Sequence, residues 1–466
     1  MIQKKISFFS LVLLIVAAID SIRNLPASAL FGSSLIFFFI LSAIIFLVPT
    51  ALIAAELSAT FPEKGGVYHW VSKAFGEKWA MVAIWLQWIN TIVWYPTILS
   101  FIAGTAAYLI NPELVHQKWY LVTCILIVFW GVTLANLRGI NFSARINNIC
   151  AMIGTIFPML FLIALGTFWF FSGKPLQIQM DAKSIVPSLS DSTNWISLIA
   201  IMASFLGMEL SGVHVNEIHN PQRNFPKAVF LASLFILLSM VLGSLAIAFV
   251  LPGKDINLVS GVMQVFSNFF DFFGMKFLTP ILTVLIVIGS VGNMTNWVIS
   301  PAKGLLQAAE YGFLPSFFTK RNKYSVASNI LLMQAVLVSL FCTLFLLVPS
   351  VNGFYWFLTA LSTELYMIMY ILMFFAALKL HYKHTERGDV FKIPGKSLGM
   401  WAVSLLGLLG CTATIAVSFL PPENVNIGSA LHYIFMIGCG NLFTITPVFL
   451  FYLYKNRKYA AMETAQ

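Results

Sequence analysis

The chain has 466 residues, of which 59% are hydrophobic and only 9% charged, and its mean hydropathy is +0.88. Soluble domains carry about 25% charged residues, so this composition excludes a soluble globular protein and places most of the chain in a membrane. The formal net charge of +10 could indicate a nucleic-acid or anionic-lipid partner. The positions of the basic residues indicate a topology signal instead, and no nucleic acid is expected as a partner.

Twelve apolar segments follow one another along the chain. Each is about 17–30 residues long, the length that a helix needs to cross a bilayer. We therefore predict an all-α polytopic membrane protein embedded in the lipid bilayer. The expected spans, numbered 1 to 12, cover residues 7–31, 33–60, 79–110, 119–136, 145–171, 195–218, 227–251, 276–300, 327–348, 354–378, 398–420 and 430–454.

The basic residues are unevenly distributed between the two sides of the membrane. With the N-terminus placed inside the cell, most of the 27 Lys and Arg residues fall in cytoplasmic loops. The basic residues expected outside are only Lys118, Lys174, Lys183, Lys254 and Lys276. This bias follows the positive-inside rule and predicts cytoplasmic N- and C-termini. Because no loop is long enough to build its own core, residues 1–466 are expected to form one transmembrane domain.

Span 1 is interrupted by a polar stretch over residues 20–26. A charge at the centre of a membrane helix is unfavourable in lipid, so Asp20 and Arg23 must face protein or water. Pro26 lacks an amide proton, and its ring clashes with a preceding helical turn. The first membrane helix is therefore expected to break here, which is tolerated at membrane depth only around a cavity.

Span 6 contains a second interruption over residues 204–212, where two glycines flank the acid Glu209. A break in the first helix of each five-span half is typical of inverted-repeat transporters, which bind substrate between two discontinuous helices. We expect repeats over about 7–171 and 195–380, followed by two peripheral helices over about 398–454.

Such broken backbone suits an amino-acid zwitterion. The amide-bearing start of the second half-helix, around residues 24–27, offers donors and a partial positive charge to a carboxylate. Carbonyls freed near 18–21 and 203–207 can accept hydrogen bonds from an ammonium group. The predicted substrate-binding residues at the two breaks are Asp20, Ser21, Ile22, Arg23, Asn24, Gly207, Met208 and Glu209.

Several motifs support a family resemblance. Ala-Ala-Glu-Leu-Ser occupies residues 54–58, and Glu-Lys-Gly-Gly-Val-Tyr-His-Trp occupies 63–70. His-Val-Asn-Glu occupies 214–217, and Gly-Val-Met-Gln occupies 261–264. With these motifs the chain resembles the amino acid/polyamine/organocation transporter superfamily, and in particular its bacterial glutamate/GABA antiporter branch.

The resemblance implies a twelve-helix, leucine-transporter-like fold with a five-plus-five inverted repeat and discontinuous helices 1 and 6. It implies sodium-independent exchange of an external amino acid for an internal one in the bacterial inner membrane. In such families the exchange often couples to a cytoplasmic decarboxylase, so that an imported amino acid is exchanged for its decarboxylation product and the cell resists acid. The branch also carries a longer C-terminal segment, so pH gating here is expected to use membrane acids or histidines.

Span 8 departs from the branch at one position. The branch has an acid four residues before a tryptophan, whereas here Trp297 matches the tryptophan and Asn293 replaces the acid. The span 1 region is also aromatic-rich in the branch, but polar in this chain. We expect Asn293, Asn296 and Trp297 to read the substrate side chain.

Some charged residues have more than one interpretation. Arg23 could bind an anionic substrate side chain through its planar guanidinium, or it could pair with Asp20 or Glu209. Glu209 could sense protons and gate the path, or it could be a satisfied structural acid. Glu364 in span 10 is a further gating candidate, whereas Glu56 is expected to bond to neighbouring backbone.

Aromatic residues could close over the ligand. Trp94, Tyr95 and Phe205 are candidate lids, as is Trp297, because flat rings seal a small site and offer cation–π contact to an ammonium group. The alternative for each ring is ordinary packing.

No catalytic or ATP-binding motif occurs in the sequence. We therefore expect neither an enzyme nor a primary pump, and no metal or cofactor. The nearest alternative function is a proton-coupled amino-acid or polyamine symporter of the same fold. An alternative from another class is a channel or signalling membrane protein without a transport cycle.

Overall fold

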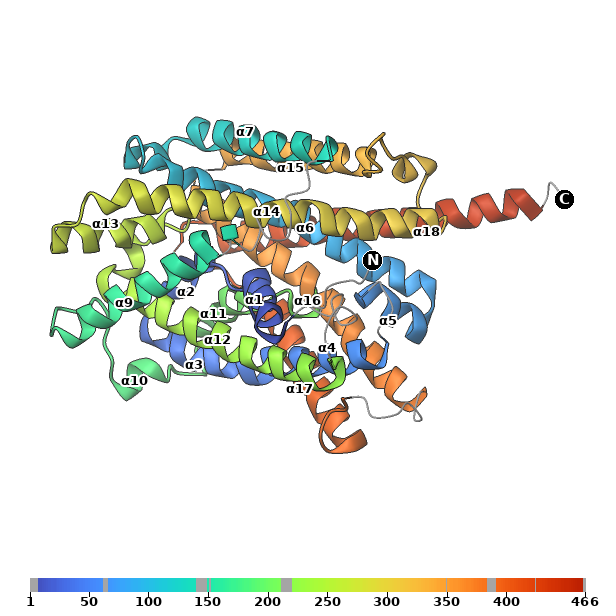
Figure 1. Cartoon of the computed structure of the whole chain (residues 1–466), viewed down its shortest axis with the longest axis horizontal. Helices are drawn as coiled ribbons and strands as arrows, with labels where there is room; N and C mark the ends of the chain where they lie inside the picture. Colours follow the sequence, from blue (N-terminus) through green and yellow to red (C-terminus); the bar gives the residue numbers. More distant parts are fainter. Residues whose placement is uncertain are drawn as a thin grey trace.

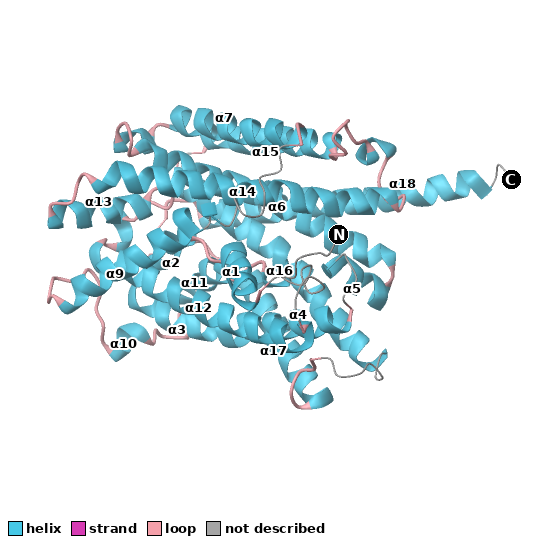
Figure 2. Ribbon diagram, in the orientation of Figure 1, coloured by secondary structure: helices cyan, strands magenta, loops and turns pink. Residues whose placement is uncertain are grey.

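The computed structural model describes residues 7–61, 66–139, 149–150, 152–210, 220–348, 350–383, 391–423 and 425–463. Within these ranges the chain forms helices and loops and no strand (Figure 2). Among the described residues, twelve helical segments are long and apolar enough to cross a membrane. The predicted all-α polytopic fold with twelve spans is therefore confirmed.

The membrane helices follow the predicted order. Span 1 consists of α1 (Phe8–Ile19), η1 (Ile22–Asn24) and α2 (Leu25–Ala29), and span 2 of η2 (Gly32–Ser34), α3 (Leu35–Ser42), η3 (Ala43–Leu47) and α4 (Val48–Thr60). Span 3 is α6 (Glu77–Ala107), and span 4 is α7 (Lys118–Leu137). Span 5 consists of η5 (Met152–Ile156) and α9 (Phe157–Phe171), and span 6 of η6 (Ser192–Ile196) and α11 (Ser197–Ser204). Spans 7 to 12 are α12 (Pro221–Val250), α14 (Leu278–Glu310), α15 (Ser328–Leu347), α16 (Val351–Lys383), α17 (Lys396–Ser418) and α18 (Ala430–Glu463). The connections contain α5 (Gly66–Phe75), η4 (Pro112–His116), α10 (Ala182–Ile185), η8 (Gly253–Asp255), α13 (Gly261–Phe273) and η9 (Ser316–Thr319).

Two helices form the centre of the bundle. In the most apolar windows of α6 and α16, 89% and 78% of the residues are buried, against 17% in α18. The two central helices pack against each other, while α7 and α15 lie together along one edge (Figure 1). The end of α18 extends beyond the bundle in the same view. Helices α6 and α16 therefore form the core of the bundle, and α18 has an apolar surface suited to lipid.

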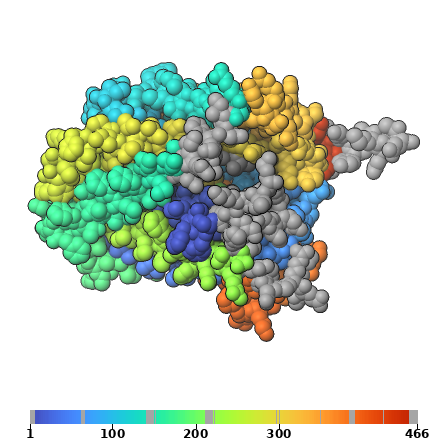
Figure 3. Space-filling model, viewed as in Figure 1, coloured from blue at the N-terminus to red at the C-terminus, as the bar shows by residue number. Residues whose placement is uncertain are grey.

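Span 1 breaks where the sequence predicts. Helix α1 ends with the hydrogen bond from the Asp20 N–H to the Val16 carbonyl, and Asp20 and Ser21 then adopt extended backbone. Pro26 lies in the first turn of α2, where its missing N–H costs no helical bond. Figure 3 shows the dark-blue start of α1 at the surface, beside yellow-green atoms of α12. The break itself is buried.

Span 6 breaks at its glycine. Helix α11 ends at Ser204, and Gly207 has φ +106°, a backbone conformation that side chains disfavour. A single 3₁₀ turn follows over residues 208–210. The predicted break in span 1 is therefore present, and the first half-helix of span 6 ends where its break was predicted; residues 211–219, which follow, lie outside the described part of the chain.

Spans 5 and 8 approach at two glycines. A Cβ built on Gly289 of α14 would lie 2.3 Å from the Cα of Gly154 in η5. Small residues allow membrane helices to pack backbone against backbone. This contact lies two turns before Trp297 and fixes the part of α14 that carries the candidate site.

Candidate functional site

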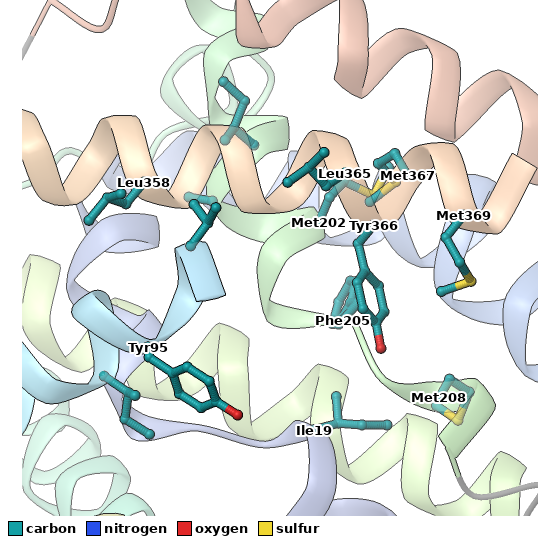
Figure 4. Packing of buried hydrophobic residues seen from close by; sticks show 14 of the residues in the cluster. Ile19, Tyr95, Met202, Phe205, Met208, Leu358, Leu365, Tyr366, Met367 and Met369 are labelled. Carbon is teal, nitrogen blue, oxygen red and sulfur yellow. The ribbon is translucent and has the colours of Figure 1, made fainter. Parts of the chain in front are cut away.

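The two helix breaks lie next to each other. A Cβ built on Gly207 would lie 3.7 Å from a side-chain carbon of Ile19 and 3.7 Å from the Trp297 ring. Figure 4 shows the Tyr366 hydroxyl of α16 pointing to the side where Ile19 and Met208 lie, and the Gly207 N–H donates to the Tyr370 hydroxyl of the same helix at 3.0 Å. Spans 1, 6, 8 and 10 thus meet at one place, which we call the break site.

Arg23 is buried in the break site, with 6% of its surface exposed. Its Nη1 donates to the hydroxyl of Thr97 at 2.9 Å and to that of Tyr355 at 3.0 Å. Its Nε has no hydrogen-bond partner, and no carboxylate of the described residues lies within ion-pair distance. The alternative pairing with Asp20 or Glu209 is therefore absent, and neutral hydroxyls hold the guanidinium.

A row of aromatic rings continues from Arg23. The guanidinium lies 5.3 Å from the centre of the Trp94 ring, and Trp94 lies 5.4 Å from the Trp297 ring. The Tyr95 hydroxyl donates to the Trp297 carbonyl at 2.7 Å. Trp94 and Trp297 remain half-buried, whereas Tyr95 is fully buried. The structure brings these predicted residues together, and the two tryptophans are positioned to contact a ligand.

Glu209 lies in a cradle of neutral donors. Its side chain accepts hydrogen bonds from the Tyr366 hydroxyl at 2.7 Å, from the Tyr370 hydroxyl, and from the Gln87 amide at 3.5 Å. The Tyr370 hydroxyl also accepts from the Gly207 N–H at 3.0 Å. Glu209 is 1% exposed. The acid is thereby connected, through the Tyr370 hydroxyl, to the glycine that breaks span 6.

Asp20, the other charged residue of span 1, contacts α12. One carboxylate oxygen accepts from the Ser239 hydroxyl of α12 at 2.9 Å, and the other has no hydrogen-bond partner. The acid is 1% exposed. Because buried polar atoms are almost always hydrogen-bonded, this oxygen is an unsatisfied acceptor at the break in span 1.

The other predicted residues take different positions. Ile22 and Asn24 are buried, whereas Ser21 and Asn293 are half-buried. Asn293 lies one helical turn before Trp297 and so shares its face of α14. The side chain of Asn296 lies outside the described part of the structure, as do residues 62–65 and 211–219, including His214 and His219 of the motifs.

Two predicted acids bond away from the breaks. Glu364 accepts from the Ser418 hydroxyl of α17 and the Asn441 amide of α18, so it connects the core to the peripheral helices. Glu56 accepts from the Ile393 N–H at 2.6 Å and faces His381 at 3.5 Å. It bonds to backbone as expected, but the backbone is distant in sequence.

Sequence reasoning missed the residues that hold the charged groups. Thr97, Ser239 and Tyr355 carry no signal of their own in a chain rich in hydroxyls and aromatics. Tyr366 and Tyr370 do have a signal, because a spacing of four places both on one face of span 10. Polar atoms on one face of a central helix indicate an interior partner, here Glu209.

Comparison with known proteins agrees with the resemblance that the sequence motifs indicate. A family model described as amino acid permease matches residues 6–441. The chain is similar to an uncharacterized transporter of Legionella pneumophila, with 41% identity over 96% of both chains. It is similar to a glutamate/gamma-aminobutyrate antiporter of Lactococcus lactis, with 29% identity over 97% of this chain and 91% of the relative. A probable agmatine/putrescine antiporter of Lactococcus lactis is 25% identical over 84% of this chain and 83% of the relative.

Proposed function

Because the chain belongs to the amino acid permease family of the amino acid/polyamine/organocation superfamily, we propose that it exchanges an external amino acid for an internal amino acid or its decarboxylation product by alternating access. The 29% identity to a glutamate/gamma-aminobutyrate antiporter supports a glutamate/GABA-like pair. The distribution of Lys and Arg supports both termini in the cytoplasm, and the bacterial relatives support a place in a bacterial inner membrane. A decarboxylase that converts the imported amino acid would link the exchange to acid resistance.

The observation that carries this proposal is the buried guanidinium of Arg23 at two adjacent helix breaks. In the proposed complex, the substrate α-carboxylate binds the amides at the start of η1 and α2, where the helix dipole is positive. The α-ammonium group binds carbonyls freed near residues 18–21 and 203–207 together with the free oxygen of Asp20. An anionic side chain binds Arg23, whose Nε is unpaired.

The aromatic and amide residues take the remaining roles. Trp94 and Trp297 cover the ligand, and Asn293 and Asn296 of α14 read its side chain. Tyr95 supports this cover, since its ring lies 5.7 Å from that of Trp94 and its hydroxyl donates to the Trp297 carbonyl, whereas Phe205 packs against Phe39. Alternating access then requires the break in span 6 to move relative to α16, where Tyr370 now holds Gly207.

A second candidate function is a proton-coupled amino-acid or polyamine symporter. Glu209 supports it, since a buried acid surrounded by neutral donors can take up and release a proton without an ion-pair partner. The two functions differ in what drives uptake. An obligate exchanger needs internal substrate, whereas a symporter needs only a proton gradient.

Counterflow in proteoliposomes tests the proposal. Vesicles are loaded with glutamate, GABA, arginine, glutamine or buffer alone, and entry of each labelled compound is followed. Antiport predicts entry that requires internal substrate and is greatest for glutamate and GABA. Accumulation in buffer-loaded vesicles under a pH gradient would favour the symporter, and absence of entry under every condition would contradict both.

A further inference from the structure

Helix α2 is held to α16 at both of its ends. Just before α2, the Nη1 of Arg23 donates to the Tyr355 hydroxyl at 3.0 Å. Just after α2, the ring of Phe31 lies 6.1 Å from the ring of Trp356, which follows Tyr355 in α16. Both α16 side chains are fully buried. We call these two contacts the α2 clamp, because together they fix the second half of span 1 against α16.

The α2 clamp extends from an outer cavity to the break site. The cavity measures about 170 Å³ and is lined by Phe31 and its neighbours at the end of span 1, by η6, and by Pro422 and Glu423 after α17. In the expected topology, span 1 ends and span 6 begins on the outer side of the membrane. Phe31 thus lies at this cavity, whereas Arg23 lies in the break site. The clamp must come apart before a path can open between the two.

The polar contact of the clamp depends on the charge of Arg23. Its Nη1 donates to two neutral hydroxyls, that of Thr97 in α6 and that of Tyr355 in α16. No carboxylate of the described residues lies within ion-pair distance. A buried charge that loses a hydrogen-bond partner is strongly destabilised. Because one hydrogen bond to a charged group changes an equilibrium constant about 10- to 150-fold, separating Tyr355 from Arg23 is unfavourable by a factor of this size in the empty protein.

We propose that the α2 clamp keeps the empty protein closed on its outer side and thereby makes exchange obligatory. An obligate exchanger must not change its open side while it is empty, since a substrate could then cross without a counter-substrate. The inference rests on the exchange function proposed above. It assigns Tyr355 as a positioning residue, which acts on transport through Arg23.

A bound anion releases the clamp. In the proposed complex, the side-chain carboxylate of the substrate binds Arg23 and supplies the counter-ion that the described part of the protein lacks. The guanidinium then no longer depends on the Tyr355 hydroxyl, so α2 separates from α16 at a lower cost. The occupied protein therefore opens outward more readily than the empty protein, and each outward opening carries a substrate.

Entry of labelled glutamate into proteoliposomes that contain buffer alone tests the clamp. The pH is equal on both sides, so the label moves only down its own gradient. For each variant, this entry rate is divided by the entry rate into glutamate-loaded vesicles, which corrects for the amount of active protein. Tyr355→Phe keeps the ring and removes the hydroxyl. We expect it to raise the ratio at least tenfold over that of the original protein.

Tyr120→Phe is the matched control. Tyr120 of α7 donates to the Ala103 carbonyl of α6 at 3.0 Å, so this substitution also removes a hydroxyl bond between two helices, but away from the clamp. Its ratio should equal that of the original protein. A second variant, Phe31→Ala, removes the ring contact with Trp356 and should raise the ratio as Tyr355→Phe does.

The outcomes separate the clamp from the exchange function. A ratio in Tyr355→Phe no higher than in Tyr120→Phe would overturn the clamp and leave the proposed antiport standing. If Tyr355→Phe gives no exchange at all, the ratio in Phe31→Ala decides in the same way. Entry into buffer-loaded vesicles as fast in the original protein as into glutamate-loaded ones would contradict antiport itself, and the clamp with it.

Discussion

The hydroxyl of Tyr370 provides a quantitative test of how the span 6 break is held. It accepts from the Gly207 N–H at 3.0 Å and donates to the Glu209 carboxylate, so Tyr370→Phe removes the acceptor of the Gly207 N–H and the donor to one oxygen of Glu209. A neutral hydrogen bond contributes about 0.5–1.5 kcal/mol, and a bond to a charged group about 1.5–3 kcal/mol. We expect the free energy of unfolding to fall by about 2–4 kcal/mol.

Tyr366→Phe is the matched comparison, because Tyr366 lies one turn earlier on α16 and also donates to Glu209, at 2.7 Å. It makes no bond to Gly207 and accepts only a long bond from the Gln87 amide at 3.4 Å, so its loss should be smaller than that of Tyr370→Phe, by at most about 0.5–1.5 kcal/mol. Unfolding in mixed detergent micelles measures both variants. Equal stability of the two variants, or a larger loss in Tyr366→Phe, would refute the role assigned to the Gly207 bond.

Two further substitutions test helix packing near the break site and a hydrogen bond away from it. Gly289→Ala places a Cβ 2.3 Å from the Gly154 Cα, so we expect a loss of about 1–3 kcal/mol and a lower melting temperature; Gly438→Ala, whose Cβ has open space, should melt like the original. Glu56→Ala removes the acceptor of the Ile393 N–H and should speed deuterium exchange of the amides near residue 393. Unchanged exchange there would show that Glu56 does not hold this segment.

The fold was largely predictable because hydrophobicity must match the bilayer. Twelve apolar segments of sufficient length have few alternatives to twelve membrane helices, and the described part of the chain has twelve such helices. The breaks were predictable for a related reason. Asp20 and Arg23 cannot face lipid, and Pro26 and Gly207 each disfavour a continuous helix.

The partners of the charged residues were much harder to predict. Arg23 has carboxylates nearby in sequence and in the facing span, which made an ion pair a natural hypothesis. The structure instead joins it to Thr97 and Tyr355, from helices far away in sequence. Glu364 similarly bonds to the peripheral helices. Such partners depend on how helices rotate about their axes, and a sequence of almost uniformly apolar spans fixes that rotation weakly.

The central claim is that the break site binds the transported amino acid, with Arg23 facing an anionic side chain. Counterflow of glutamate and of glutamine in Arg23→Ala vesicles tests it most directly, because glutamine has a neutral amide in place of the side-chain carboxylate; Arg23→Lys is the comparison that keeps the charge but loses the planar fork. Loss of one charge-assisted contact of about 1.5–3 kcal/mol predicts that glutamate entry falls about 10- to 150-fold more than glutamine entry, with partial recovery in Arg23→Lys. Equal losses for the two substrates would contradict the claim.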